Sequence, residues 1–149
     1  TVQEEVGLQG ARMVGADLDL DAVVAVDVTH AGDHPGLDVG QRSPVELGRG
    51  PVVVRGSANH PVLVAEARSA ADDEGIDVQL QASGSRTGTD ADAFYVASGG
   101  TPALSVGVPN RYMHTPAEVV DAGDLTGTAR LLGSLVARLA ARDSFAVDV

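Results

Sequence analysis

The 149-residue sequence contains no cysteine, no tryptophan and no lysine, and only two tyrosines and two phenylalanines. Without cysteine it can form neither a disulfide framework nor a thiolate metal site, so any metal must be held by His, Asp or Glu. No apolar run reaches the ~18 uncharged residues of a membrane-spanning helix. The first ten residues, TVQEEVGLQG, lack the basic and apolar regions of a signal peptide. We therefore expect no membrane partner and a cytoplasmic location.

The chain has few positive charges, and every one of its ten basic residues is arginine, against 21 Asp and Glu residues. The formal net charge of −11 repels phosphate backbones, so no nucleic-acid partner is expected. Two interpretations remain open. The protein comes from a GC-rich genome in which Arg replaces Lys, or it is halophilic, with salt screening its self-repulsion. We favour the second, which predicts loss of structure at low salt.

Apolar segments and helical patterns alternate along the chain, which predicts an α/β fold. We expect a three-layer α/β/α sandwich around a mixed sheet, truncated at its N-terminal side. Apolar or alternating runs predict strands at 1–3, 22–28, 51–54, 78–82 and 102–108, and periodicity predicts helices at 7–16, 61–74, 90–97 and 125–142. The Val-rich run 22–28 is expected to be buried on both faces, and 30–50 to form a long loop. The last helix is expected to point five apolar side chains inward: Leu131, Leu132, Leu135, Val136 and Leu139.

Acidic residues and one histidine follow three of the predicted strands. Glu4 and Glu5 follow the first, Asp27 lies near the end of the second, and His114 follows the strand 102–108. Ligands of open α/β sheets gather beyond the carboxyl ends of strands, and this donor set suits zinc, cobalt or manganese. Alternatives remain for each: Glu4 and Glu5 as a charge pair at a helix start, Asp27 satisfied by backbone donors, and His114 as a helix-capping residue.

Four segments, QEEVGLQGA, AVDVTHAGDHPG, TGTDADAF and GGTPALSVGVPNRYMHTPAEVVD, resemble in sequence and order the M42 family of metallo-aminopeptidases. That family includes the glutamyl and tetrahedral (TET) aminopeptidases, some of which have been labelled endoglucanases. The resemblance implies a hydrolase with two divalent metal ions (zinc, cobalt or manganese), peptide substrates and a homo-oligomeric intact protein. It implies that Glu4 is the general acid/base, that Glu5 and His114 bind one metal, and that Asp27 binds the other.

The resemblance also places Gly88, Thr89 and Asp90 near the substrate, although a simple turn and helix cap explains them equally well. It gives no ligand role to His30 or His34. Arg111 and Tyr112 are expected to support His114.

The sequence departs from the family in what it lacks. The family's His-x-Asp motif and its metal-bridging Asp lie upstream of the Glu pair, as does its inserted assembly domain, and none has a counterpart here. Arg49 replaces the Lys of the family's Gly-Lys-Gly-Pro motif. We therefore expect 1–149 to be one partial catalytic domain, its C-terminal portion, inactive alone. The alternatives are a non-catalytic fragment that contributes only packing and interfaces, or a zinc-dependent deacetylase or carboxypeptidase of similar fold.

Overall fold

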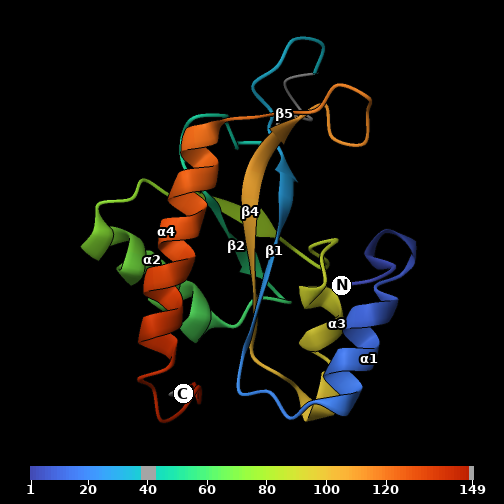
Figure 1. Cartoon of the computed structure of the whole chain (residues 1–149), viewed down its shortest axis with the longest axis vertical. Coiled ribbons are helices and arrows are strands. Elements are labelled where there is room, and N and C mark those ends of the chain that lie inside the picture. Colours follow the sequence, from blue (N-terminus) through green and yellow to red (C-terminus); the bar gives the residue numbers. More distant parts are fainter. Residues whose placement is uncertain (38–42, 148–149) are drawn as a thin grey trace.

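The computed structural model describes residues 1–37 and 43–147 (Figure 1). Part of the predicted loop 30–50, residues 38–42, lies outside the described residues. In chain order the elements are η1 (Glu4–Val6), α1 (Gln9–Asp17), β1 (Val23–His30), β2 (Val52–Gly56), α2 (Pro61–Glu74), β3 (Gln79–Ser83), α3 (Ala91–Phe94), η3 (Ala97–Gly99), β4 (Ala103–Arg111), β5 (Val119–Val120) and α4 (Ala122–Leu139). No helix within 1–37 and 43–147 is long and apolar enough to cross a bilayer.

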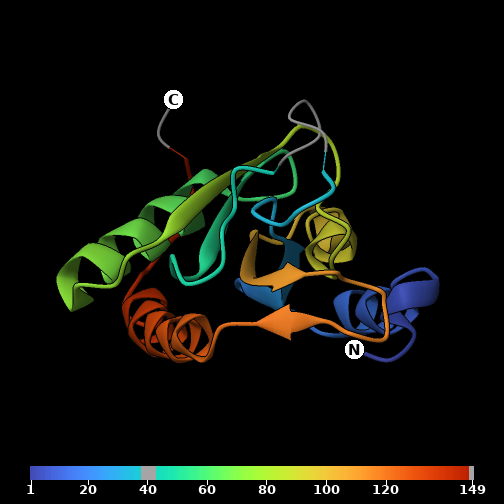
Figure 2. The same ribbon diagram turned by 90° about the horizontal axis from the view of Figure 1, so that it is seen from above.

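The sheet is mixed, as predicted. Its strands lie in the order β1-β4-β2-β3, with β5 paired to β4. β1 runs parallel to β4, and β2 runs parallel to β3, but β2 and β4 are antiparallel. Helices α2 and α4 cover one face, and α1 and α3 lie on the other (Figures 1 and 2). The predicted α/β sandwich is therefore confirmed.

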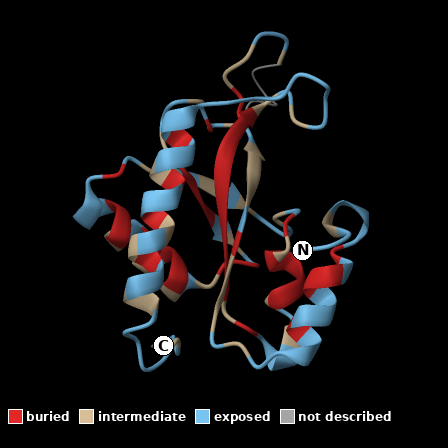
Figure 3. Cartoon of the chain, viewed as in Figure 1, coloured by how far each residue is buried: buried red, intermediate tan, exposed pale blue. Residues whose placement is uncertain are grey.

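The main core lies between the sheet and the α2–α4 pair (Figure 3). Val53, Leu63, Leu104, Leu131 and Leu135 are each 0% exposed there. Burying one such side chain contributes about 1.5–3 kcal/mol. This core fixes β2 and β4, and thereby the strand that leads to His114.

Helix α4 begins three residues earlier than the periodicity indicated. The Asp121 carboxylate caps it by accepting hydrogen bonds from the backbone N–H groups of Gly123 (2.7 Å) and Asp124 (3.4 Å). The expectation that Val136 faces inward was wrong, since its side chain is 57% exposed. Leu131 and Leu135, each 0% exposed, carry the packing instead.

The expectation of a strand at 1–3 was also wrong. Gln3 has a left-handed backbone (φ 57°), and the Val2 carbonyl accepts a hydrogen bond from Gly10 N–H at 2.9 Å. A Cβ atom at Gly10 would lie 2.7 Å from that carbonyl oxygen, so only glycine permits the contact. The chain therefore folds back against α1 before Glu4.

Strand β1 differs from its prediction in burial. Among the described residues it pairs only with β4, and Val26 is 49% exposed, so the strand is not buried on both faces. It also continues to His30, which places Asp27 within the strand rather than at its end.

Ion pairs that join α2 to the end of α4 and to the residues just after it use several of the scarce positive charges. Arg138 contacts Glu66 (3.0 Å) and Asp73 (2.8 Å), and Arg142 contacts Glu66 as well. Most acidic side chains within residues 1–37 and 43–147 have no such partner, as expected when the sequence holds 21 acidic and 10 basic residues. Added salt should therefore stabilise the fold, because it screens the repulsion among unpaired carboxylates more than it weakens these few ion pairs.

We predict that the free energy of unfolding rises by more than about 1 kcal/mol between about 0.1 M and 2 M KCl, because salt screens this repulsion. Chemical denaturation at each salt concentration measures it. A variant with four exposed carboxylates neutralised should depend less on salt: Asp17→Asn, Asp19→Asn, Asp72→Asn and Asp143→Asn. Equal salt dependence in the two proteins would contradict the halophilic interpretation.

Candidate functional site

Glu4 and Glu5 lie in the short helix η1, not at the end of a strand as expected. Leu8, which follows them with a left-handed backbone (φ 58°), is 8% exposed and packs in the core beneath α1 and α3. This buried anchor and the turn at Gln3 hold the two carboxylates at the start of α1. Glu4 is half-buried, whereas Glu5 is exposed.

His114 lies on the loop between β4 and β5 and has a left-handed backbone (φ 62°). Such a conformation costs a non-glycine residue about 1–3 kcal/mol and is concentrated at functional sites. Glu118 holds it: its carboxylate accepts hydrogen bonds from His114 N–H (2.7 Å) and from Asn110 Nδ2 (2.6 Å). In this arrangement His114 Nε2 lies 3.4 Å from Glu5 Oε1.

Asp27 projects from β1 at the register position opposite Gly107 of β4. Burial raises the pKa of its carboxyl group, a hydrogen bond from Val28 N–H (2.7 Å) opposes the rise, and the charges of Glu5 and Asp90 add to it. A cavity of about 170 Å³ opens beside Asp27. A carboxylate held in this way favours a positively charged neighbour.

The electrostatics join these residues into one cluster. Partial burial raises the pKa of Glu4, and the negative charges of Asp27, Glu5 and Asp90 raise it further. His114 in turn lowers the pKa of Asp27. Four carboxyl groups and one imidazole therefore lie close enough to influence one another's ionisation. A cation bound among them would relieve the repulsion between the carboxylates.

The fit to a metal ion is partial. Carboxylate and imidazole are the donors that zinc, cobalt and manganese accept, and Glu5 and His114 are in contact. Within residues 1–37 and 43–147, however, no three His, Asp or Glu side chains are placed to hold one ion. The structure brings Glu5 and His114 into contact. Asp27 lies apart from that pair, although the charges of Glu5 and His114 still shift its pKa.

The predicted substrate segment is held by its own hydrogen bonds. Asp92 is 8% exposed and accepts a hydrogen bond from Gly88 N–H (2.9 Å), while the Thr89 hydroxyl bonds to Ser105 Oγ (2.8 Å). Thr89 lines the cavity beside Asp27, and Asp90 contributes to the electrostatic field of the cluster. Asp92, which sequence reasoning did not select, therefore organises this segment.

Arg111 and Tyr112 do not support His114, contrary to expectation. Arg111 forms two hydrogen bonds to Asp33, from Nε (2.8 Å) and from Nη2 (2.6 Å), and holds the pKa of that carboxyl group below its usual range. The Tyr112 ring packs on His34, with centroids 4.8 Å apart. Both residues instead fix the loop that follows β1.

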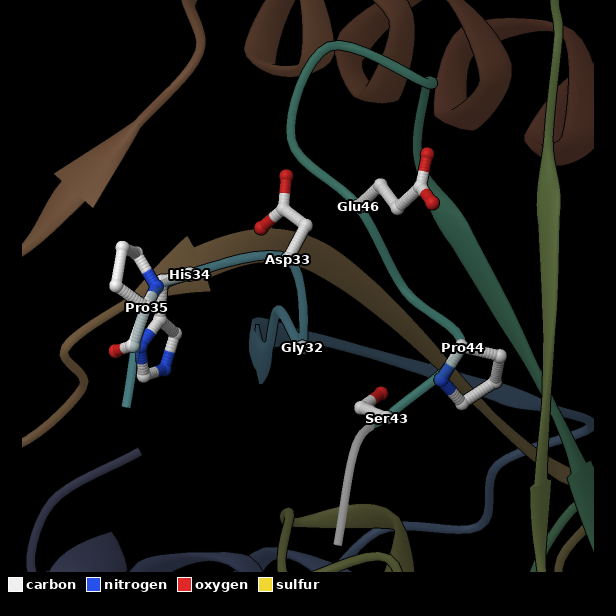
Figure 4. Close-up of a pocket in the computed structure, with 7 residues that line it drawn as sticks. All are labelled: Gly32, Asp33, His34, Pro35, Ser43, Pro44 and Glu46. Atoms are coloured by element: carbon white, nitrogen blue, oxygen red, sulfur yellow. The ribbon is translucent and has the colours of Figure 1, made fainter. Parts of the chain in front are cut away.

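That loop forms a larger hollow of about 510 Å³ (Figure 4). Asp33 and His34 lie on one limb, and Pro44 and Glu46 on the other. None of the cluster residues lines this hollow. We therefore locate the candidate site by its chemistry, at the acidic cluster, and not by cavity size.

Glu118 is the positioning residue that sequence reasoning missed. It is the only carboxylate between His114 and β5, four residues after the histidine, and this spacing was the available signal. Hydrogen bonds from Asn110 and from His114 N–H lower the pKa of Glu118. The ionised Glu118 carboxylate therefore stabilises the loop fully at pH values above the ordinary pKa of glutamate. This stabilisation is lost as the pH falls through the lowered pKa of Glu118 in the folded chain.

We predict that Glu118→Ala accelerates hydrogen exchange of the His114 amide at least about fivefold, because that N–H loses its acceptor. Glu118→Gln retains one carbonyl oxygen, so its exchange rate at the His114 amide should lie between those of the parent and Glu118→Ala. Exchange measured by NMR tests this, with Glu74→Ala, at the far end of α2, as the matched control. Unchanged protection in Glu118→Ala would show that the carboxylate does not hold His114.

Comparison with known proteins gives consistent matches. The sequence model of the family described as M42 glutamyl aminopeptidase matches residues 1–131. The lysyl aminopeptidase of Pyrococcus furiosus is 37% identical over 143 residues, which cover 96% of this chain and 40% of that protein.

Solved structures agree. A TET aminopeptidase of the marine sediment archaeon Thaumarchaeota archaeon SCGC AB-539-E09 superposes with a TM-score of 0.83 at 30% identity, over 93% of this chain and 39% of that one. The Pyrococcus horikoshii TET1 peptidase, described as assembling into a tetrahedron or a large octahedral shell, gives 0.69 at 29% identity, over 91% and 38%. The chain thus spans about 40% of the length of the curated relatives it matches.

Proposed function

Because the chain belongs to the M42 glutamyl aminopeptidase family, we propose that it supplies the acid/base residue and part of the metal site of an aminopeptidase. The observation that carries the proposal is the contact of Glu5 with His114, beside the carboxyl groups of Glu4 and Asp27. The family resemblance expected from the sequence motifs is confirmed, and with it a relationship to metal-dependent hydrolases.

Four residues of the cluster have roles in the proposed reaction. Glu5 and His114 would hold one divalent ion, and Asp27 would hold a second. Bound ions would polarise the scissile carbonyl and make a water molecule more acidic. Glu4 accepts the proton of that water and returns it to the departing amine, and its raised pKa brings it closer to a working pH.

The substrate is proposed to be a peptide with a free N-terminus. Glu4 and Asp90, to which the proposal gives no metal, keep their negative charges beside the bound ions and would attract the α-ammonium group of a peptide. This favours an aminopeptidase over a carboxypeptidase of similar fold.

The chain alone is proposed to be inactive. No group of three ligands lies within the described residues, so the remaining ligands must come from elsewhere in the intact enzyme. We propose that the other 60% or so of the family's length supplies them. We also propose that the intact protein assembles from identical copies, by analogy with the shell described for the Pyrococcus horikoshii TET1 peptidase.

Two polypeptides test the proposal: the 149-residue chain, and a longer one in which the M42 segment that relatives carry upstream precedes it. Each is given zinc, cobalt or manganese and the p-nitroanilides of leucine, lysine and glutamate. We expect metal-dependent turnover from the longer polypeptide only, and none with N-acetyl-leucine p-nitroanilide, the matched substrate without a free amine. A folded longer polypeptide that cleaves none of the free-amine substrates, or one that prefers the acetylated substrate, contradicts the proposal.

A further inference from the structure

A groove lies between the first two turns of α2 and strands β2 and β3, with a cavity of about 410 Å³. Arg55 of β2 and Arg68 of α2 border it, and Val64 and Leu80 provide an apolar wall. Leu80 is 46% exposed although it lies within a strand. Charged and apolar side chains thus line the same groove, a combination that is typical of small-molecule binding sites.

The two arginines are unusual in this chain because they have no partner among the described residues. The other arginines of residues 1–37 and 43–147 each bind a carboxylate or a backbone carbonyl: Arg12, Arg49, Arg86, Arg111, Arg130, Arg138 and Arg142. The guanidinium groups of Arg55 and Arg68 form neither a hydrogen bond nor an ion pair within that part of the chain, and both residues are exposed. In a protein of net charge −11, two unpaired guanidinium groups on one groove form a local site for an anion.

A buried residue with an unpaired donor borders the same groove. Asn59 is 5% exposed, and its Oδ1 accepts a hydrogen bond from Ser105 N–H at 2.6 Å. Its Nδ2 is buried without a partner among the described residues. An unsatisfied buried amide costs about 1–3 kcal/mol, and most such groups in proteins have a partner. A ligand with an acceptor oxygen would satisfy it.

The start of α2 adds further donors. The helix has 14 residues, and the side chain of its N-cap residue, His60, makes no capping hydrogen bond. Pro61, which lines the groove, has no N–H, so the first-turn donors are those of Val62 and Leu63. The positive end of a helix dipole favours a negative group at this place.

We propose that this groove binds a small organic anion, with its carboxylate or phosphate group between Arg55 and Arg68 and its apolar part against Val64 and Leu80. The site is separate from the acidic cluster. Side chains alternate along a strand, and Val54, the neighbour of Arg55, lines the cavity beside Asp27 on the other face of the sheet. The proposal therefore does not depend on the aminopeptidase assignment.

NMR titration of the ¹⁵N-labelled full chain tests the proposal. Inorganic phosphate and isovalerate are titrated separately at constant ionic strength, with chloride as the reference anion. We expect saturable shifts of the Arg55 Nε–H, the Asn59 side-chain amide and the backbone amides of Val62 and Leu63. Saturation by phosphate alone identifies a phosphate ligand, and saturation by isovalerate alone identifies an apolar carboxylate.

Matched variants separate this site from general charge effects. The double variant Arg55→Gln/Arg68→Gln should weaken binding at least tenfold while keeping the dispersed spectrum of the fold. Arg130→Gln removes an exposed arginine that pairs with Glu74 and should leave binding unchanged. The proposal is overturned if neither anion gives saturable shifts, or if the double variant binds as tightly as the parent.

Discussion

Replacing Glu4 with Gln is expected to lower turnover of a free-amine p-nitroanilide by about 10²–10⁴-fold in the longer polypeptide. Glutamine keeps the size of the side chain but cannot accept the proton of the attacking water. The metal content should stay the same, because the proposal gives Glu4 no metal to hold. Steady-state kinetics together with metal analysis of the same preparation measure both quantities.

Two other glutamates serve as controls for this prediction. Glu5→Gln should lose metal as well as activity, because the proposal makes Glu5 a ligand beside His114. Glu74→Gln, at the exposed end of α2, should change neither. If Glu4→Gln retains turnover within about threefold of the parent, or loses its metal, the acid/base assignment is wrong.

Asp124→Ala is expected to lower the free energy of unfolding by about 2–4 kcal/mol. Asp124 is 1% exposed in the first turn of α4, and its carboxylate accepts hydrogen bonds from Gly48 N–H (2.8 Å) and Gly50 N–H (2.7 Å). Alanine would leave both donors without an acceptor. Because Gly48 and Gly50 have left-handed backbones (φ 74° and 87°), the turn depends on this side chain to hold its shape.

Urea denaturation of the 149-residue chain tests this expectation. Asp72→Ala, an exposed aspartate on α2, is the matched control and should change stability by less than about 0.5 kcal/mol. Asp124→Asn keeps one acceptor oxygen and should give an intermediate loss. A loss below about 1 kcal/mol in Asp124→Ala would mean that water replaces the carboxylate and that the turn is not anchored there.

Elements with strong local signals could be predicted from the sequence. Helix α2 was predicted with its observed bounds, because Pro61 marks its first turn and Gly75 (φ 61°) ends it. The short strand β5 was missed, since two residues carry no periodicity. The strand predicted at 1–3 failed because three residues, Thr-Val-Gln, carry too short a pattern to indicate the left-handed turn at Gln3.

At the candidate site, too, local sequence signals were informative and long-range contacts were not. Residue type and motif order selected Glu4, Glu5, Asp27 and His114, and the structure places Glu5 against His114. Long-range partners left no such signal in the sequence. The pair of Arg111 with Asp33 joins residues far apart in the chain, so the sequence alone could not show that Arg111 is engaged away from His114.

The most direct test of the proposed site is the crystal structure of the longer polypeptide grown with zinc, with anomalous scattering used to locate the metal. We predict one anomalous peak bound by Glu5 and His114 at about 2.0–2.2 Å and a second bound by Asp27, with the Glu4 carboxylate close to both but bound to neither. Zinc held by other residues, with these four side chains turned away from it, would contradict the account.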